Sequence, residues 1–404
     1  MAEIKPFRGY AYNKEKIKDI STVIAPPWDV IDEEAEKRLR ALSPWNIINL
    51  ISGGADPERA KELFEAWIGQ NILVREEEER FYFGRHRFSW QGKHFVRKGV
   101  FALIRLEDFG AGSVIPHEEV FEKHHANRYR LIEKCRANFS PVFMLYRDES
   151  RTMEKIIEVS VPDAEGMIGD GDSFAFGRIE GEGNTSTVKE LLSRGKLIIA
   201  DGHHRYQAAL RYYKDNPAPE NGFVLVFLVN IESPELLIMP THRYVTHDVS
   251  FAGNKSLFEK HFDVEGVSSR GAMFEKMQKE ERAGIFGVYE KGEFYIIKLK
   301  NLGDIRKYAG GDFSDRRLSL DTVILHSFVI DEILKPCADG VFYHQSPGYL
   351  LNEYDRRKTG VIFFLNPVGK KQFADICLNG ELMPQKTTYF YPKVPSGFVI
   401  NRFE

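Results

Sequence analysis

The sequence predicts a mixed α/β fold of the α+β class, and three kinds of segment support this prediction. The run GFVLVFLVNI (residues 222–231) is almost entirely apolar, as expected for a strand that is buried on both faces. Residues 319–334 carry apolar side chains at helical spacing. Apolar and polar residues alternate around a turn in residues 85–106 and again in residues 284–300, which is typical of β-hairpins.

The same patterns predict the other elements of the chain. Residues 160–186 are rich in Gly, Asp and Ser, and they predict a long loop. No repeat of fixed period is present. The further expected elements are helices at residues 33–42, 57–68 and 368–378, and a central strand at residues 361–366.

The composition argues against several classes of protein. The chain has 404 residues, enough for two or three domains at about 100–200 residues each. Its 56 basic and 59 acidic side chains give a net charge of -3, so the basic footprint of nucleic-acid-binding proteins is missing. The 3 cysteines are widely spaced and indicate neither a disulfide framework nor a CxxC metal site. We therefore expect no nucleic-acid partner.

The sequence also argues against a membrane location. The first residues, MAEIKPFRGYAYN, are charged and lack the apolar core of a signal peptide. No apolar run approaches the ~20 residues that a membrane-spanning helix needs. We therefore expect a cytoplasmic location and no membrane partner, while the oligomeric state stays open.

The stretch LIIADGHHRYQAALRYY (residues 197–213) is the strongest candidate for a functional site. A buried strand is expected at residues 196–200, and Asp201 follows it where the N-cap of the next helix belongs. His203, His204 and Arg205 then lie in the first turn of that helix. One face of the helix is expected to pack on the core, through apolar side chains at i, i+3, i+4 and i+7: Tyr206, Ala209, Leu210 and Tyr213.

Cationic side chains in a first turn are unfavourable for the helix itself, because its N-terminus already carries partial positive charge. The free N–H groups and the added positive charge favour an anion, and phosphate is the natural ligand. A single histidine at a helix start is ordinarily a surface or core residue. The run Asp-Gly-His-His-Arg between a buried strand and an amphipathic helix is harder to explain by packing alone. We therefore interpret residues 201–205, the DGHHR box, as a phosphate site.

A second charged segment, HEEVFEKHHANRYR (residues 117–130), contains a candidate general base. It does not match the HExxH zinc pattern, because Phe121 occupies the position of the second histidine. A metal site on one helix face, a solvated helix and a charged active-site loop remain alternatives. In the last of these Glu118 is the base. The other charged side chains of the segment that we consider are His117, His124, His125, Arg128 and Arg130.

Three further cations are candidates for phosphate contact. Arg243, in PTHRYV, closely follows the strand at residues 222–231, so we expect it to return to a site at that end of the sheet. Lys386 and Lys393 flank the sequence TTYFYP. They either reach phosphate or are ordinary exposed lysines.

Short motifs along the whole chain resemble a known family. The sequence ADGHHRYQAAL looks like the signature of domain-of-unknown-function family 1015. The likeness continues in PFRGYAYN, APPWDVI, SPWNIINL, PTHRYV and MPQKTTYFYPKVPSGFV. The order of these motifs identifies the chain as a member of that family, but the family supplies no activity.

The DGHHR box also resembles the nucleotide-binding box of the ParB/sulfiredoxin superfamily, which includes ParB-type CTP-binding proteins, sulfiredoxin and free-serine kinases. The serine kinases are the most similar, because they have an Asp-Gly-His-His-Arg run of their own. The resemblance implies that Gly202, His203, His204 and Arg205 contact nucleotide phosphates. Sulfiredoxin has a reactive cysteine where this chain has His203, so cysteine-based chemistry is not implied. Neither the charge nor the hairpins indicate the basic DNA-binding domain of ParB-type proteins.

The resemblance implies a ParB/sulfiredoxin-like core with large insertions. We expect residues 1–250 to form this nucleotide-binding core, with the inserted hairpin and helices, and residues 251–404 to form a C-terminal α/β region. Whether the second region is a separate domain or completes one sheet stays open. Strands at residues 196–200 and 222–231 flank one helix, which predicts a parallel, right-handed unit in one sheet.

Two classes of function follow from these interpretations. In the first, the chain transfers a phosphoryl group from ATP or ADP, with Mg²⁺, to a small hydroxylated metabolite such as serine. His204 and Arg205 then hold phosphate oxygens. Asp201 binds the metal ion or the acceptor, and Glu118 accepts the acceptor proton. In the second class, the box binds a nucleotide as a regulatory switch with little or no turnover.

Overall fold

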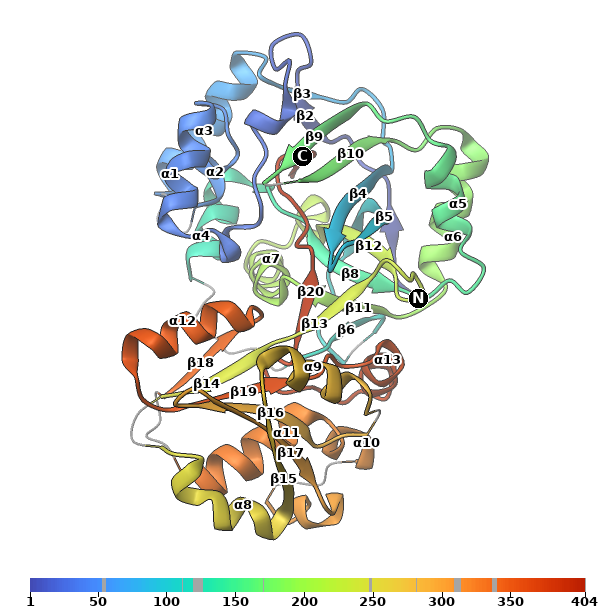
Figure 1. The fold of residues 1–404 in the computed structure, drawn as a ribbon. Coiled ribbons are helices and arrows are strands. Elements are labelled where there is room, and N and C mark those ends of the chain that lie inside the picture. The colour runs from blue at the N-terminus through green and yellow to red at the C-terminus, as the bar shows by residue number, and fades with distance from the viewer. Residues whose placement is uncertain are drawn as a thin grey trace. The chain divides into compact units, whose positions relative to one another are not determined.

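The computed structural model of the protein forms two compact units (Figure 1). The first unit consists of Met1–Leu237 together with Pro392–Glu404, and the second of Ile238–Tyr391. This division corrects the expected boundary after residue 250, because the second unit begins earlier and the last residues belong to the first unit. The structure describes residues 1–52, 56–110, 112–118, 126–169, 171–246, 249–280, 282–308, 314–335 and 340–403.

The C-terminal segment belongs to the first unit because it pairs and packs there. Strand β21 (Asn401–Arg402) forms a two-stranded sheet with β7 (Ala137–Asn138). The ring centroids of Phe398 and Phe174 are 4.7 Å apart. Pairing between segments so far apart along the chain leaves no local signal, so a boundary drawn from the sequence missed it.

The first unit is built on one mixed sheet of nine strands. Their spatial order is β6-β11-β8-β12-β5-β4-β10-β9, and β1 pairs with β5. The strands are β1 (Ile4–Lys5), β4 (Tyr82–Trp90), β5 (Lys93–Arg105), β6 (Val114–Pro116), β8 (Val142–Tyr146), β9 (Ala164–Ile168), β10 (Asp172–Arg178), β11 (Leu197–Asp201) and β12 (Phe223–Asn230). A separate pair consists of β2 (Tyr10–Tyr12) and β3 (Leu73–Arg75).

The helices of the first unit include those expected near its N-terminus. Residues 33–42 form a helix as predicted, and the helix predicted at residues 57–68 extends by one residue. The α-helices are α1 (Glu33–Leu42), α2 (Ile48–Ile51), α3 (Pro57–Gly69), α4 (Ala126–Cys135), α5 (Thr152–Val159), α6 (Glu182–Ser193) and α7 (His203–Asp215). The short 3₁₀ turns are η1 (Ile20–Thr22), η2 (Trp28–Val30) and η4 (Pro219–Gly222).

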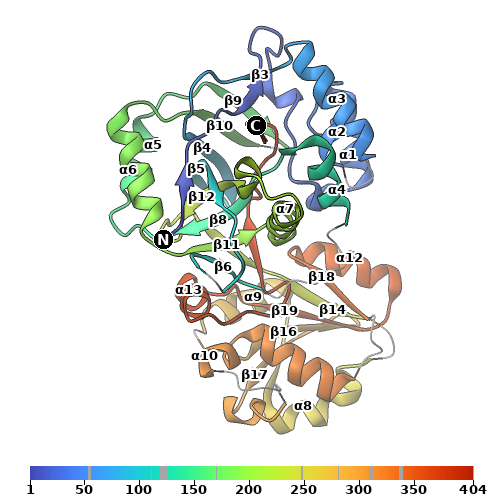
Figure 2. The same cartoon turned by 180° about the vertical axis from the view of Figure 1, so that it is seen from behind.

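The two faces of the nine-stranded sheet have different coverings. All eight residues of β12 are buried, so the predicted strand with two buried faces is confirmed. Val224, Val226 and Leu228 point to the core that α5, α6 and α7 share. Phe227 points to the other face, where its ring lies 4.7 Å from that of Phe101. Figure 2 shows α7 over the strands, with α5 and α6 together at one side of the unit.

Strands β11 and β12 lie in the same sheet, as the strand–helix–strand prediction required, but they are not parallel. β8 lies between them, antiparallel to β11 and parallel to β12. The direction of β12 is set by its antiparallel ladder with β5, which extends from Phe223 to Val229. The parallel unit was therefore wrong, because strand pairing and not the intervening helix decided the direction.

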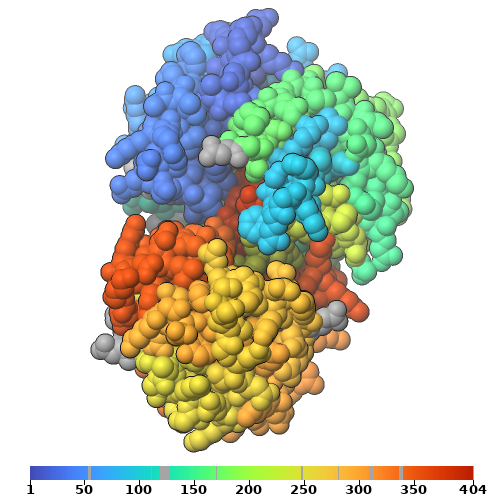
Figure 3. Space-filling model, viewed as in Figure 1, coloured from blue at the N-terminus to red at the C-terminus, as the bar shows by residue number. Residues whose placement is uncertain are grey.

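Residues 160–186 do not form the predicted long loop, because they contain β9, β10 and the start of α6. A Cβ on Gly177 in β10 would lie 2.7 Å from the ring of Phe83, and a Cβ on Gly166 in β9 would lie 2.6 Å from Ile20. These glycines permit close packing inside strands and do not mark turns. On the face drawn in Figure 3, the green residues of β9 lie beside the blue N-terminal residues.

The second unit has a six-stranded sheet in the order β15-β17-β16-β19-β14-β18, and β13 pairs separately with β20. The hairpin predicted at residues 284–300 and the central strand at residues 361–366 are both confirmed. Its strands are β13 (Leu237–Pro240), β14 (His242–Val245), β15 (Phe262–Val267), β16 (Ile285–Glu290), β17 (Glu293–Leu299), β18 (Val341–His344), β19 (Val361–Leu365) and β20 (Thr388–Tyr391).

Helices cover both faces of this second sheet. Met273 of α9 and Leu350 of α12 pack on one face, and Phe258 of α8 and Phe328 of η7 pack on the other. The helix predicted at residues 319–334 begins at α11 and continues as a π-helix, η7. The helices are η5 (Ala252–Asn254), α8 (Lys255–His261), α9 (Arg270–Gln278), η6 (Leu302–Ile305), α10 (Asp315–Leu318), α11 (Asp321–Ile324), η7 (Leu325–Leu334), α12 (Pro347–Arg357) and α13 (Lys370–Leu378).

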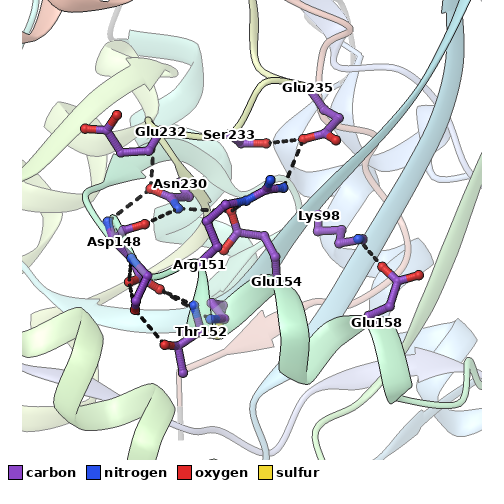
Figure 4. Close-up of polar contacts among 12 residues, drawn as sticks. Lys98, Asp148, Arg151, Thr152, Glu154, Glu158, Asn230, Glu232, Ser233 and Glu235 are labelled. Atoms are coloured by element: carbon purple, nitrogen blue, oxygen red, sulfur yellow. Dashed lines mark hydrogen bonds and ion pairs between the residues drawn. The ribbon is translucent and has the colours of Figure 1, made fainter.

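A buried polar cluster lies where β8 and β12 end (Figure 4). Asn230 donates to the carbonyl of Asp148 at 2.7 Å and to Glu154 Oε1 at 2.9 Å. Asp148 accepts hydrogen bonds from the backbone N–H groups of Ser150 and Thr152 at 3.0 and 2.7 Å. We call Asp148, Arg151, Glu154, Asn230 and Glu235 the Asp148 cluster.

Among the helices that the structure describes, none is long and apolar enough to span a membrane.

Candidate functional site

The DGHHR box forms a strand–turn–helix junction. β11 ends at Asp201, and Gly202 makes the turn with φ 91° and ψ 28°, a left-handed conformation that favours glycine. Helix α7 begins at His203 and receives no side-chain cap from the described residues. Asp201 is therefore not the N-cap that the sequence predicted, because the turn at Gly202 separates it from the helix and its carboxylate has other partners.

The first turn of α7 is held against the core by the helix face that the sequence predicted. Tyr206 and Ala209 are buried there, with Tyr212 beside them, whereas Leu210 and Tyr213 are only partly buried. The Tyr206 hydroxyl donates to the backbone carbonyl of Glu107 at 2.9 Å. These contacts fix the helix N-terminus at the end of β11.

Two cations bind the Asp201 carboxylate. Arg205 Nη2 lies 2.6 Å from Asp201 Oδ2, and Lys393 Nζ donates to Asp201 Oδ1. The exposed fractions of these side chains are 15% for Arg205, 16% for Asp201 and 11% for Lys393. Burial alone would raise the pKa of the Asp201 carboxyl. The charges of Lys393 and Arg205 outweigh burial and hold that pKa well below its usual range, so the group is ionised.

Lys393 reaches the box because the C-terminal segment crosses the first unit. Arg97 Nη1 donates to the carbonyl of Pro392 at 2.6 Å, directly before Lys393. The hydroxyls of Ser140 and Ser396 lie 2.6 Å apart, just after it. The sequence left Lys393 open between phosphate contact and an exposed lysine. The structure shows a half-buried lysine in an ion pair, which excludes the exposed alternative.

The parallel pairing of β6 with β11 brings Glu118 to the box. Ile199 is opposite Pro116 in this ladder, so the residues that follow on each strand run side by side. Glu118 Oε1 lies 3.7 Å from His203 Nδ1, and Glu118 Oε2 lies 3.9 Å from His117 Nε2. Glu118 is thus a neighbour of the DGHHR box, although Gly202 lies 84 positions later in the chain. The ladder between β6 and β11 brings the two segments together.

The two buried imidazoles beside Glu118 are neutral. Burial lowers the pKa of His203 well below its ordinary value, and the neighbouring His117 lowers it further. Burial also lowers the pKa of His117, although Glu118 acts in the opposite direction. His117 Nδ1 lies 2.6 Å from the carbonyl of Ile199, so it carries the proton. His203 Nε2 accepts the backbone N–H of His117 at 3.3 Å, which leaves the His203 proton on Nδ1, toward Glu118.

Arg243 belongs to the second unit, whereas the DGHHR box belongs to the first. Arg243 lies in β14 of the second unit, in a different sheet from β12. Its guanidinium is buried there, where it donates to His326 Nε2 at 3.1 Å and to the carbonyl of Thr241. The chain enters a new sheet after β13, so Arg243 does not lie in the sheet that contains β12, and its contact with phosphate stays a prediction. Lys386 also belongs to the second unit.

Three of the remaining predicted residues lie in helices α7 and α4. His204 is half-buried in the first turn of α7. Arg128, from α4, lines a small cavity together with Arg205. Arg130 is exposed on the same helix. His124 and His125 lie outside the described residues.

The residues near Asp201 do not fit a protein-built Mg²⁺ site. Among the described residues there is no group of three or more His, Cys, Asp or Glu side chains that could hold a metal ion. Each oxygen of Asp201 already contacts a cationic side chain. Mg²⁺ requires oxygen ligands and keeps several waters, which a carboxylate with two bound cations does not provide.

Two residues of the site had weak signals in the sequence. Lys393 lies in a motif that marked the family, but nothing local links it to Asp201, which is 192 positions away. His117 stood next to Glu118 in the charged segment, yet its burial depends on the β6–β11 ladder. Only long-range pairing reveals that both belong to the site.

Comparison with known proteins gives one family and several solved structures. The family model described as "Protein of unknown function (DUF1015)" matches residues 4–323. No curated relative matches the chain. A conserved hypothetical protein from Pyrococcus furiosus is 12% identical with a TM-score of 0.38, over 74% of this chain and 94% of that one.

Two further solved structures show a similar degree of likeness. A free serine kinase in complex with AMP is 12% identical with a TM-score of 0.39, over 75% of this chain and 91% of the kinase. A C-terminally truncated SbnI from Staphylococcus aureus is 11% identical with a TM-score of 0.37, over 74% and 86% of the two chains.

Proposed function

We propose a catalytic function for this chain, which belongs to the DUF1015 family of proteins of unknown function: it is a nucleotide-dependent phosphotransferase that acts on a small hydroxylated metabolite. The observation that carries the proposal is the ionised Asp201 between Lys393 and Arg205, beside the N-terminus of α7. Lys393 and Arg205 are the cations that would meet phosphate oxygens. The uncapped N–H groups of α7 add donors to the same region.

Phosphoryl transfer needs positioned positive charge more than covalent help from the protein. Gly202 has no side chain, so nucleotide phosphates can approach the backbone there. His204 and Arg205 bind phosphate oxygens, and Arg205 does so through charge-assisted hydrogen bonds. The donor is ATP or ADP, and Mg²⁺ arrives with the nucleotide as part of the substrate.

Asp201 keeps the two cations in place while the site is empty. A buried lysine or arginine without a partner is costly, and the Asp201 carboxylate removes that cost. When phosphate binds, it competes with Asp201 for the same N–H donors. In this proposal Asp201 is a positioning residue, and the metal-ligand role that the sequence suggested for it is not carried further.

Glu118 is the general base of the proposed reaction. The attacking hydroxyl loses its proton as the new P–O bond forms, and a carboxylate within hydrogen-bond reach accepts it. The neutral His203 keeps its Nδ1 proton toward Glu118, so it can hold this carboxylate in position. One carboxylate for the proton and a separate group of cations for the phosphates is the division of roles that a small-molecule kinase needs.

The experiment is a transfer assay with the purified full-length chain. ATP, ADP, CTP and GTP are each incubated with Mg²⁺ and a panel of hydroxylated metabolites, and phosphorylated products are detected by mass spectrometry. We expect Glu118→Gln to bind nucleotide like the wild type and to lose at least ~100-fold in acceptor-dependent turnover. Glu149→Gln, at an exposed position, is the matched control and should leave turnover unchanged.

The alternative function, a nucleotide-binding switch, predicts a different result in the same assay. Tight nucleotide binding with no acceptor-dependent product from any member of the panel would favour the switch. Equal turnover of Glu118→Gln and the wild type would remove Glu118 as the base.

A further inference from the structure

A cavity of about 40 Å³ lies beside the DGHHR box in the first unit. Two cationic side chains line it: Arg128 of α4 and Arg205 of α7. Ser140 and Asn138 add polar groups. The other lining residues are apolar: Ile51, Leu131, Ile132, Ala137, Phe139 and Val224. Apolar walls with a few polar groups are typical of small-molecule sites.

The guanidinium of Arg128 makes few hydrogen bonds to the part of the chain that the structure describes. Within the described residues its single hydrogen bond is a long one, from Nη1 to the carbonyl of Ile51 at 3.4 Å. Among the described residues, most of its five N–H donors therefore make no hydrogen bond and could serve a ligand in the cavity. Arg205 contributes a second guanidinium, which is already bound to Asp201 and to the carbonyl of Pro141.

The two arginines in one cavity repel each other. Burial lowers the pKa of Arg128, and the charge of Arg205 lowers it further, whereas Asp29 acts in the opposite direction. The Asp201 carboxylate cannot neutralise this pair, because it is shared between Arg205 and Lys393. An anion in the cavity would relieve the repulsion and use the donors of Arg128.

The size of the cavity indicates which anion. A water molecule needs about 10–15 Å³ on this measure, so the cavity holds roughly three waters. A carboxylate has three heavy atoms and matches that space. Arginine binds carboxylates through two parallel hydrogen bonds, which suits a cavity that two arginines line.

We propose that the cavity between Arg128 and Arg205 binds the carboxylate of the acceptor, so that the acceptor is a small hydroxylated carboxylate compound. This inference rests on the proposed function only where it identifies the bound compound as the acceptor. Carboxylate binding in the cavity can be measured without turnover. Arg128 then determines specificity, because an acceptor that lacks the carboxylate leaves its charge without a partner.

The experiment measures binding and does not depend on catalysis. L-serine, D-glycerate and glycerol are titrated into the full-length chain and followed by calorimetry and ligand-observed NMR. Glycerol is the matched ligand control, since it keeps the hydroxyl groups of glycerate and lacks its carboxylate. We expect L-serine or D-glycerate to bind the wild type and glycerol not to bind.

Protein variants test the residue. Arg128→Gln should weaken carboxylate binding at least tenfold and leave nucleotide affinity within twofold of the wild type. Arg130→Gln, exposed on the same helix, is the matched control and should change neither. Leu131→Phe keeps both arginines and fills the cavity, so it should also weaken carboxylate binding. Thermal unfolding of each variant checks that it is folded.

Three results would overturn the inference. The first is a wild type that binds none of the hydroxycarboxylates, or that binds glycerol as well as glycerate. The second is an Arg128→Gln variant, or a folded Leu131→Phe variant if Arg128→Gln does not fold, that binds carboxylate like the wild type. The third is a loss of nucleotide affinity in Arg128→Gln, which would assign the cavity to donor phosphates. Carboxylate binding without any turnover would sink the proposed kinase and leave this inference standing.

Discussion

Asp148 and Asp201 lie at opposite ends of β8, and the carboxylates of both are largely withdrawn from solvent. Asp148 comes just after the last residue of β8 and binds backbone N–H groups at the start of α5, including that of Thr152. Asp201 pairs with the beginning of β8 and binds the side chains of Arg205 and Lys393. The same sheet therefore holds two buried carboxylates with different kinds of partner.

The difference teaches how to distinguish a structural carboxylate from one at a binding site. Backbone N–H groups cannot leave Asp148 unless the first turn of α5 unfolds, so that carboxylate serves the fold (Figure 4). The long side chains of Arg205 and Lys393 can turn from Asp201 to an arriving anion while the backbone stays in place. A buried carboxylate with side-chain cations is thus the better candidate for ligand exchange.

The largest effect on stability is expected in the Asp148 cluster. Asn230→Ala removes an amide that donates to Asp148 and Glu154 and accepts the N–H groups of Asp148 and Glu232. Because these groups are buried, we expect a loss of about 3–5 kcal/mol in the free energy of unfolding. Nucleotide affinity should not change in the folded variant. Urea unfolding and calorimetry measure the two quantities, and a folded Asn230→Ala that has lost nucleotide binding would contradict the comparison.

The next largest effect is expected at the box, where a substitution should change nucleotide binding and leave stability nearly unchanged. Arg205→Ala removes a proposed phosphate donor and should weaken nucleotide binding by roughly 100-fold, or about 2.7 kcal/mol. Its stability should change little, because Lys393 still pairs with Asp201. The matched control is Arg151→Ala in the Asp148 cluster, which removes an arginine paired with Glu235. If both variants bind nucleotide equally well, the box is not the phosphate site.

The smallest effect is expected in the pH dependence of the free energy of unfolding. Here the histidines of the site differ from the Asp148 cluster, whose five defined members include no imidazole. The pKa of His203 is lowered in the folded state, so the unfolded chain binds more protons below pH ~6.5. Stability is therefore lost as the pH falls below that value. His203→Gln should reduce this slope by up to about 1.4 kcal/mol per pH unit between roughly pH 5 and 6.5.

Unfolding by urea at several pH values measures that slope. His94→Gln, at an exposed position near the start of β5, is the control and should leave the slope unchanged. An equal slope in His203→Gln and the wild type would mean that His203 does not stay neutral when the chain folds.

The sequence by itself predicted elements whose cause is local. The periodic apolar spacing of residues 33–42 and 57–68 predicted helices, and Gln91 with Gly92 marked a hairpin turn. The strand before Asp201 and the helix after Gly202 were also predicted, because burial and helical spacing are visible within one short stretch. The box was found for the same reason.

Glycine-rich segments were the opposite case. Residues 160–186 contain enough Gly, Asp and Ser to predict a loop, yet Gly166 and Gly177 lie in strands. Only the close approach of Ile20 and Phe83 explains why those positions lack a side chain. The composition of a segment does not show which distant residues pack against its glycines, so the strands could not be predicted from it.

Tertiary structure alone decided how the candidate site is assembled. The ladder between β6 and β11 brings Glu118 beside His203, and the C-terminal segment brings Lys393 to Asp201. Strand pairing likewise set β12 antiparallel to β11 and left Arg243 in the second unit. The sequence determined the chemistry of the box because helix capping, burial and charge act between near neighbours. It could not determine the partners, because pairing between distant segments depends on the free energy of the whole fold.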